Sequence, residues 1–308
     1  MLGHELLEML RMPSQLGAVP DSTKRFPDGA HYRIEIPSVE GPDVCSAVLD
    51  EAKARGIGVH RVSQGSGVTM LTREELGRWA QLGADHQLEV SLYVRPTASW
   101  GTGAAWLSST GHPLAGQVHG LAQLGAALDQ VRRAVRAGFR SVLVTDVGVL
   151  SAIAQLKALG QLPADLAVKA GAQMGVANPL SAQLVDKLGV ASINVPSDLS
   201  LGDLAALRSS VDAPLDIYLE SPDDLGGFIR AHEIADIVRV AAPVYLKFGL
   251  RNAAPLYPSG THTQALAVSL ARERVRRAQL GLELLQEIDG SLTATSGASN
   301  LAIPQPNA

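Results

Sequence analysis

The chain of 308 residues contains one cysteine, Cys45. A single thiol excludes an internal disulfide, a cysteine-based zinc site and a cysteine-ligated iron–sulfur cluster within one chain. Because Cys45 falls in an apolar stretch of a predicted helix, we expect it to be a small core residue. The sequence therefore predicts a protein without an iron–sulfur cluster.

Three further features are missing. No apolar run approaches the ~20 residues that span a bilayer, and no signal-peptide pattern opens the chain, so we expect a cytoplasmic protein without membrane contact. The net charge of −4 gives no basic surplus for nucleic acid, which is not an expected partner. There is no Gly-x-Ser-x-Gly elbow, no His-Glu-x-x-His helix and no cysteine nucleophile with a partner, so no peptidase motif is evident.

What is present is a regular alternation. Hydrophobic residues make up 46% of the chain and charged residues 18%, which is enough apolar material for one large core. From residue 31 onward, short apolar or β-branched runs alternate with stretches of helical period, as in repeated βα units. Eight runs have this form: 32–37, 59–63, 88–94, 141–144, 166–170, 192–195, 215–219 and 244–248. We predict the α/β class and a single (β/α)₈ barrel of the TIM type.

The sequence also predicts the limits of the barrel. Residues 1–30 are expected to form an N-terminal extension with a short helix over 4–11, residues 31–288 the barrel, and residues 289–308 a flexible Ser/Gly/Pro-rich tail. The stretch 264–288 predicts a long C-terminal helix. Pro42 and Gly56 frame an earlier helix, and Thr72 with Glu75 predicts a capping box.

The block from 141 to 207 carries three motifs. It reads VTDVGVL, then GAQMGVANPLSAQLVDKLGV, then PSDLSLGDLAAL. In these motifs the chain resembles the U32 peptidase family, most specifically over residues 131–220. The matching positions are Asp146, Gly148, Val149, Gln173, Asn178, Leu188, Gly189, Asp198 in place of a family glutamate, and Leu199 to Leu201.

The resemblance implies a barrel fold. Some family members are named as peptidases or collagenases, and others assist hydroxylation of RNA or ubiquinone with a cysteine-held iron–sulfur cluster. Such members continue from the seventh strand into a His-Gly step and a cysteine cluster, whereas this chain reads LESPDD from Leu219 to Asp224. The cluster chemistry is therefore not implied for this chain.

Barrel enzymes place their reacting groups at the C-terminal ends of the strands. Among the polar residues there, the candidate catalytic groups are Glu35, Asp146, Glu220 and Lys247. A charge inside a buried strand is costly unless it is paired or faces the barrel mouth, which singles out Glu35, Lys169 and Lys247. Structural pairing, such as Glu35 with Lys247, is the competing interpretation for these charges.

A metal site is a further hypothesis. Glu35, Asp146 and Glu220 could converge as oxygen ligands of Mg²⁺ or Mn²⁺. Pairing of the same carboxylates with arginines is the alternative, because ligands from separate strands leave no local spacing to test.

The barrel mouth is expected to bind a small anionic substrate that carries a carboxylate or a phosphate. The candidate substrate-binding residues are Arg61, Gln64, Arg95, Trp100, Gln173, Asn194, Arg251 and Ser259. Arg251 and Ser259 follow the last strand, where barrels commonly hold phosphate. Trp100 lies in a glycine-rich loop of about 25 residues after the third strand, which suits a lid or an oligomer contact.

Together these features predict a barrel enzyme that acts on such a substrate by acid–base or lyase/aldolase-type chemistry, with metal assistance left open. Two alternatives stay open. One is a non-catalytic or accessory barrel that binds a partner or RNA, and the other is a true peptidase or other hydrolase. A homo-oligomer is also expected, from the apolar-rich composition and from how often barrel enzymes assemble.

Overall fold

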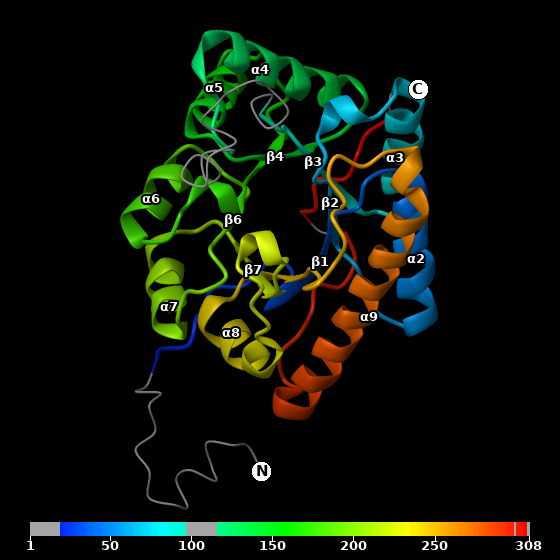
Figure 1. The fold of residues 1–308 in the computed structure, drawn as a ribbon. Helices are drawn as coiled ribbons and strands as arrows, with labels where there is room; N and C mark the ends of the chain where they lie inside the picture. The colour runs from blue at the N-terminus through cyan, green and yellow to red at the C-terminus, as the bar shows by residue number, and fades with distance from the viewer. Residues whose placement is uncertain (1–18, 97–115, 299, 307–308) are drawn as a thin grey trace, which may run out of the picture.

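The computed structural model describes residues 19–96, 116–298 and 300–306. The predicted helix at 4–11, Trp100 and most of the predicted lid loop lie outside the described residues. Eight parallel strands close into a barrel in the order β1 to β8, and the helices surround it (Figure 1). The predicted single (β/α)₈ barrel is confirmed.

Each strand lies within two residues of its predicted limits. The strands are β1 Tyr32–Pro37, β2 Arg61–Ser63, β3 Glu89–Tyr93, β4 Ser141–Val144, β5 Ala167–Ala170, β6 Ser192–Asn194, β7 Leu215–Glu220 and β8 Val244–Phe248. Strand β8 pairs with β1 in a register that places Glu35 opposite Lys247. This pairing closes the barrel.

Within the described residues, eight helices accompany the strands. They are α2 Pro42–Arg55, α3 Arg73–Asp85, α4 Gly120–Arg136, α5 Val147–Ala158, α6 Pro179–Lys187, α7 Leu201–Ser210, α8 Ile234–Ala241 and α9 Gln264–Asp289. Helix α9 is the predicted long C-terminal helix. None of these helices is long and apolar enough to cross a membrane.

Two helix ends follow the predicted local signals. Helix α2 carries Pro42 in its first turn and ends at Gly56, whose φ of 66° is readily adopted by glycine. At the start of α3, Thr72 Oγ1 accepts a hydrogen bond from the Glu75 amide at 3.2 Å, and the Glu75 carboxylate accepts one from the Thr72 amide at 2.7 Å. The predicted capping box is confirmed.

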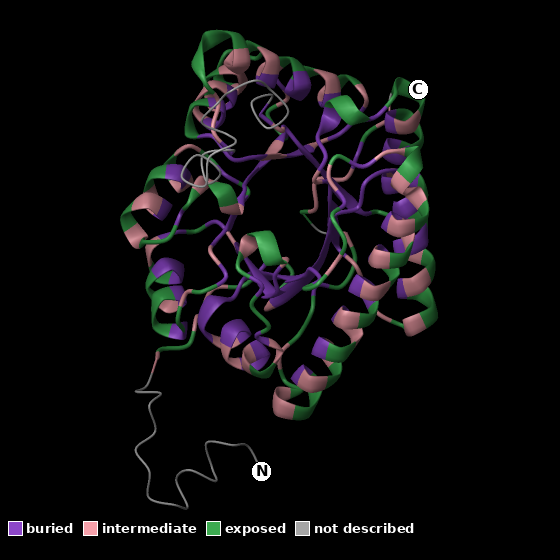
Figure 2. Ribbon diagram, in the orientation of Figure 1, coloured by how far each residue is buried: buried purple, intermediate pink, exposed green. Residues whose placement is uncertain are grey.

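The hydrophobic core lies between the barrel and the helices. Alternate strand residues such as Ile34, Val62 and Leu92 pack there with residues of the helices, and Figure 2 shows the buried residues along the strands and the inner sides of the helices. Cys45 is fully buried in this core, where burial raises the pKa of its thiol to about 12. The prediction for Cys45 is confirmed, and its thiol is not available as a nucleophile.

The C-terminal segment, predicted as a flexible tail over 289–308, makes hydrogen bonds to the barrel in its described residues. Its described residues cross the base of the barrel, where the Thr295 amide donates to the Tyr32 carbonyl at 3.1 Å and the Gln305 amide donates to the Gly138 carbonyl at 2.7 Å. His60 Nε2 lies 2.9 Å from the Thr295 carbonyl. Backbone groups at the starts of the strands need hydrogen-bond partners, and this polar segment supplies them.

Candidate functional site

The interior of the barrel contains a buried ion network centred on Glu35. Its carboxylate accepts hydrogen bonds from Arg61 Nε at 2.7 Å and from Ser63 Oγ at 2.7 Å. Lys169 Nζ donates to Oε1 at 2.5 Å, and Lys247 Nζ lies 3.3 Å from the same oxygen. Burial alone would raise the pKa of Glu35, but the charges of Arg61, Lys169 and Lys247 hold it well below its usual value.

A second carboxylate, Asp216 on β7, completes the network. Asp216 lies 2.6 Å from Arg61 Nη2 and 2.9 Å from Lys169 Nζ, and it accepts a hydrogen bond from Ser192 Oγ at 3.1 Å. Burial, followed by the nearby charge of Arg61, lowers the pKa of Lys169 to about 8. Lys169 therefore loses its proton more readily than an unperturbed lysine.

The network is balanced in charge. Glu89 on β3 is its third acid and lies 3.7 Å from Arg61 Nη1, so three carboxylates face the cations Arg61, Lys169 and Lys247. The mutual attraction of these charges offsets the cost of their desolvation only in part, but removal of one partner would leave another buried charge uncompensated. This arrangement matches the competing interpretation of the sequence, in which Glu35 pairs structurally with the strand lysines.

Lys247 connects the network to the mouth of the barrel. Its Nζ atom donates to the Asn194 side-chain oxygen at 2.7 Å, with the amide oriented so that its nitrogen donates to the Asp216 carbonyl at 3.2 Å. The ammonium group also lies 4.2 Å from the centre of the Tyr218 ring. Unlike Glu35 and Lys169, Lys247 lines the cavity above the network.

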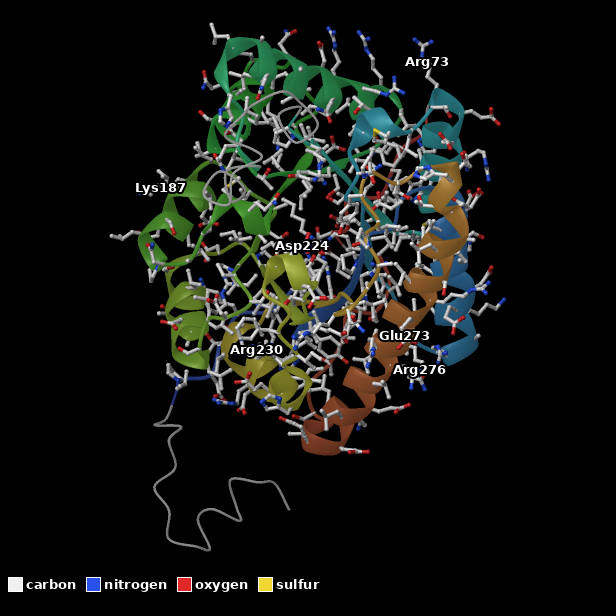
Figure 3. All side chains as sticks on the ribbon, in the orientation of Figure 1. Arg73, Lys187, Asp224, Arg230, Glu273 and Arg276 are labelled. Carbon is white, nitrogen blue, oxygen red and sulfur yellow. The ribbon has the colours of Figure 1, made fainter. Side chains whose placement is uncertain are left out.

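This mouth cavity lies at the C-terminal ends of the strands and has a volume of about 120 Å³. It is lined by Pro37, Ser38, Ser63, Gln64, Gly65, Tyr93, Arg95, Leu143, Thr145, Gly171, Ala172, Gln173, Asn194, Tyr218, Pro222, Asp224, Leu225, Lys247 and Tyr257. Figure 3 shows Asp224 on the short helix that follows β7, near the middle of the barrel. Its place at the C-terminal ends of the strands, where barrel enzymes bind their substrates, makes this cavity the candidate site.

The walls of the cavity are rich in hydroxyl and amide groups. The Tyr93 hydroxyl lies 3.0 Å from Thr145 Oγ1 and donates to Gln173 Oε1 at 3.1 Å. Arg95 Nη1 donates to the Gly65 carbonyl at 2.6 Å, and its guanidinium lies 5.6 Å from the ring centre of Tyr93. Among the lining residues, the charged ones are two cations, Arg95 and Lys247, and one acid, Asp224.

Glu40 fixes the backbone of residues 64–66, part of which lines the cavity. The Glu40 carboxylate accepts hydrogen bonds from the Gly65 amide at 2.8 Å and from the Ser66 amide at 2.9 Å. Ser66 Oγ in turn accepts from the Ser259 amide at 2.8 Å, which ties the β2 loop to the loop after β8. Burial raises the pKa of Glu40. Glu40 therefore acts as a positioning residue for the mouth.

The structure divides the predicted site residues into four groups. Gln64, Arg95, Gln173, Asn194 and Lys247 line the mouth cavity, Glu35 and Arg61 lie in the network beneath it, and Trp100 lies outside the described residues. The remaining candidates, Asp146, Glu220, Arg251 and Ser259, are not among the residues that line the cavity.

Those four residues have local partners. Asp146 caps α5 through the Val149 amide at 2.9 Å, and Glu220 accepts a hydrogen bond from the Arg251 amide at 2.8 Å. The Arg251 side chain pairs with Asp223 at 3.2 Å. Ser259 Oγ lies 2.8 Å from Thr263 Oγ1.

The three carboxylates predicted to hold a metal do not converge. Glu35 is bound by cations in the interior, Asp146 by backbone amides, and Glu220 by the Arg251 amide. In the described part of the chain no three His, Cys, Asp or Glu residues are grouped so that they could hold a metal ion. The described residues therefore do not fit a shared Mg²⁺ or Mn²⁺ site at these positions.

Sequence reasoning missed Asp216, Glu89 and the cavity residue Ser38. Asp216 and Glu89 lie near the starts of their strands. Only residues at the C-terminal ends of the strands, where barrel enzymes place their reacting groups, are candidates from the sequence. An available signal was the alternation of polar and apolar residues, as in the β7 sequence LDIYLE, which predicts one polar face inside the barrel.

Three solved structures illustrate what this chain is similar to. The chain is 14% identical to the YdjI aldolase from Escherichia coli, with a TM-score of 0.48 over 85% of this chain and 94% of that one. The U32 peptidase Mk0906 is 18% identical, with a TM-score of 0.39 over 65% and 73%. The thiamine phosphate pyrophosphorylase from Pyrococcus furiosus is 13% identical, with a TM-score of 0.45 over 84% and 97%. Such likeness carries no argument about activity.

No curated protein sequence matches the chain significantly. One family model does match, and the matched residues, 117–220, run from the start of α4 to the end of β7. They include the motifs around Asp146, Gln173 and Asp198 that carry the resemblance in the sequence. Residues 117–220 match the model of peptidase family U32.

Proposed function

We propose that this chain is a barrel enzyme that binds a small carboxylate- or phosphate-bearing molecule in the mouth cavity and uses Lys247 for acid–base or lyase/aldolase-type chemistry. The observation that carries the proposal is the position of Lys247. It lines the cavity, and its Nζ atom also reaches the Glu35 carboxylate at 3.3 Å. A substrate anion in the cavity would meet the cations Lys247 and Arg95 against the single acid Asp224.

The buried network suits proton movement away from Lys247. Glu35 contacts both Lys247 and Lys169, and the pKa of Lys169 is about 8. A lysine that loses its proton near neutral pH can take one up again, and the shared carboxylate links the two amines. Deprotonated Lys247 could act as a general base or attack a carbonyl carbon, forming an imine and releasing the carbonyl oxygen as water.

The first test is anion binding. Acetate, pyruvate and inorganic phosphate are titrated separately by ligand-observed NMR. We expect at least one of them to bind the wild type and not to bind Lys247→Met. Lys187→Met is the matched control, because Lys187 lies at the outer edge of the molecule at the end of α6 (Figure 3). Equal binding by both variants would overturn the assignment of Lys247.

The second test concerns carbonyl chemistry. Borohydride delivers hydride to an imine and leaves a stable secondary amine, so treatment with pyruvate or glyoxylate followed by borohydride should add mass to the peptide that contains Lys247. Lys187→Met should keep this adduct and Lys247→Met should lose it. Modification spread evenly over exposed lysines would argue against an imine and leave acid–base chemistry as the use of Lys247.

One observation favours the accessory alternative. A groove between α3 and α4 is lined by four arginines, Arg73, Arg132, Arg133 and Arg136, with Asp129 as the acid, and Figure 3 shows Arg73 on the outside of the molecule. Arg132 pairs with Asp129 at 2.8 Å. If the chain binds RNA, a labelled single-stranded RNA should bind with strong salt dependence and be released by Arg132→Glu with Arg136→Glu. The enzyme proposal expects no such binding.

A further inference from the structure

Ser38 and Gln64 lie side by side in the wall of the mouth cavity. Strands β1 and β2 pair in parallel with Pro37 opposite Ser63, and Ser38 and Gln64 are the residues that directly follow these two strands. Both side chains line the cavity, and the two residues are only 6% and 3% exposed. Both residues therefore belong to the cavity wall, and little of either is exposed to solvent.

Gln64 presents an acceptor without a partner. Its Nε2 atom donates to the Gly67 carbonyl at 3.0 Å, and this bond fixes the orientation of the amide. Its Oε1 atom is buried and has no hydrogen-bond partner among the described residues. A buried carbonyl oxygen that has left water without gaining a donor destabilises the folded protein. A ligand that donates to Gln64 Oε1 would remove this cost.

Ser38 presents a donor. The Tyr257 hydroxyl donates to Ser38 Oγ at 2.5 Å, and burial raises the pKa of Tyr257, so that its proton stays in place. With its oxygen occupied as an acceptor, Ser38 can direct its own hydroxyl hydrogen toward the cavity. Ser38 also has a φ of 59°, in the left-handed region that non-glycine residues seldom adopt. Strain of this kind is often kept at binding sites.

We propose that Ser38 and Gln64 form a subsite for a hydroxyl group of the substrate, with Ser38 donating to that hydroxyl and Gln64 accepting from it. The proposal rests on the proposed function, in which the anionic group of the same molecule meets the cations Arg95 and Lys247. A ketone oxygen cannot donate to Gln64, and an ammonium group cannot accept from Ser38, whereas a hydroxyl does both. The substrate class is then a hydroxycarboxylate or a hydroxylated phosphate ester.

The test compares glycolate with acetate, which lacks the hydroxyl, and with glycine, which carries an ammonium in its place. In the wild type we expect glycolate to bind about tenfold more tightly than acetate and more tightly than glycine, measured by ligand-observed NMR. In Gln64→Met and in Ser38→Gly the glycolate-to-acetate ratio should fall close to one while acetate binding is kept. Glycine in place of Ser38 adopts a φ of 59° freely, so that variant removes the hydroxyl without adding strain.

Gln155→Met, on the exposed face of α5, is the matched control and should keep the wild-type ratio. If glycolate and acetate bind equally to the wild type and both depend on Lys247, the hydroxyl subsite is wrong and the proposed function stands. If neither binds, the proposed function itself fails. Preference for glycine over glycolate, or a ratio unchanged in Gln64→Met and Ser38→Gly, would also overturn the subsite.

Discussion

The Glu35 carboxylate and the Lys247 ammonium group face each other across the seam where β8 meets β1, with 3.3 Å between Oε1 and Nζ. Glu35 lies wholly inside the barrel, whereas Lys247 also lines the mouth cavity. This ion pair therefore links Glu35, which lies in the interior network, to Lys247, which can contact a substrate in the cavity. The two residues should therefore respond differently to substitution.

Glu35→Gln should strongly destabilise the protein. The change removes the carboxylate shared by Arg61, Lys169 and Lys247 and leaves Asp216 and Glu89 as the acids of the network. Loss of one partner from a buried ion pair costs about 3–5 kcal/mol in the free energy of unfolding. Urea denaturation measures this cost. Glu273→Gln on the outer face of α9 (Figure 3) is the control, with an expected change within about 0.5 kcal/mol.

Lys247→Met should have a smaller effect on stability. Glu35 keeps Arg61 at 2.7 Å and Lys169 at 2.5 Å, so its charge stays compensated, and the methionine side chain fills most of the vacated volume. We expect a loss of about 1–2 kcal/mol by the same denaturation assay. A loss as large as that of Glu35→Gln would mean that Lys247 is mainly structural.

The fold could be predicted because its signals are local. Each strand is a short apolar run bounded by helix caps and turns, and the capping box at Thr72 and the glycine at Gly56 are each encoded within a few residues. The C-terminal segment was harder to predict. Its contacts with Tyr32 and Gly138 join residues far apart in the sequence, and a polar composition does not reveal them.

The site was only partly predictable because strand direction decides which side chains face the cavity. After β4, Thr145 lines the cavity and the next residue, Asp146, faces α5 and caps it. In β7 the register with β8 shifts between Tyr218 and Glu220, so Glu220 does not continue the inward row of Asp216 and Tyr218. Neither the irregularity nor the left-handed backbone of Ser38 has a signal in the residue types.

Lys169 should make stability depend on pH in the alkaline range. Its pKa is about 8 in the folded protein and 10.5 when unperturbed, so between these values the unfolded chain binds the extra proton. Unfolding free energy then rises with pH, and the contribution is complete above the unfolded value. We expect the difference in unfolding free energy between wild type and Lys169→Met to shift in favour of the wild type from pH 8 to pH 10.5. A flat difference across this range would show that Lys169 stays charged.

Glu220→Gln separates a structural from a chemical role for a residue that the sequence places among the leading catalytic candidates. Glu220 accepts a hydrogen bond from the Arg251 amide at 2.8 Å, and a glutamine oxygen can accept the same bond. The charge lost is the one that faces Arg277 Nε at 3.5 Å, and the Arg277 side chain is 41% exposed, so solvent weakens that pair.

We therefore expect Glu220→Gln to lower the unfolding free energy by about 1 kcal/mol or less and to leave anion binding at Lys247 unchanged. Thermal melting and ligand-observed NMR on the same preparation measure both quantities. Lost binding with an unchanged melting temperature would instead place Glu220 in the chemistry. A loss of about 3–5 kcal/mol with intact binding would mean that Glu220 balances a buried cation. Arg274 is the candidate cation. Burial lowers the pKa of Arg274, and the nearby charge of Glu220 is among the effects that raise it.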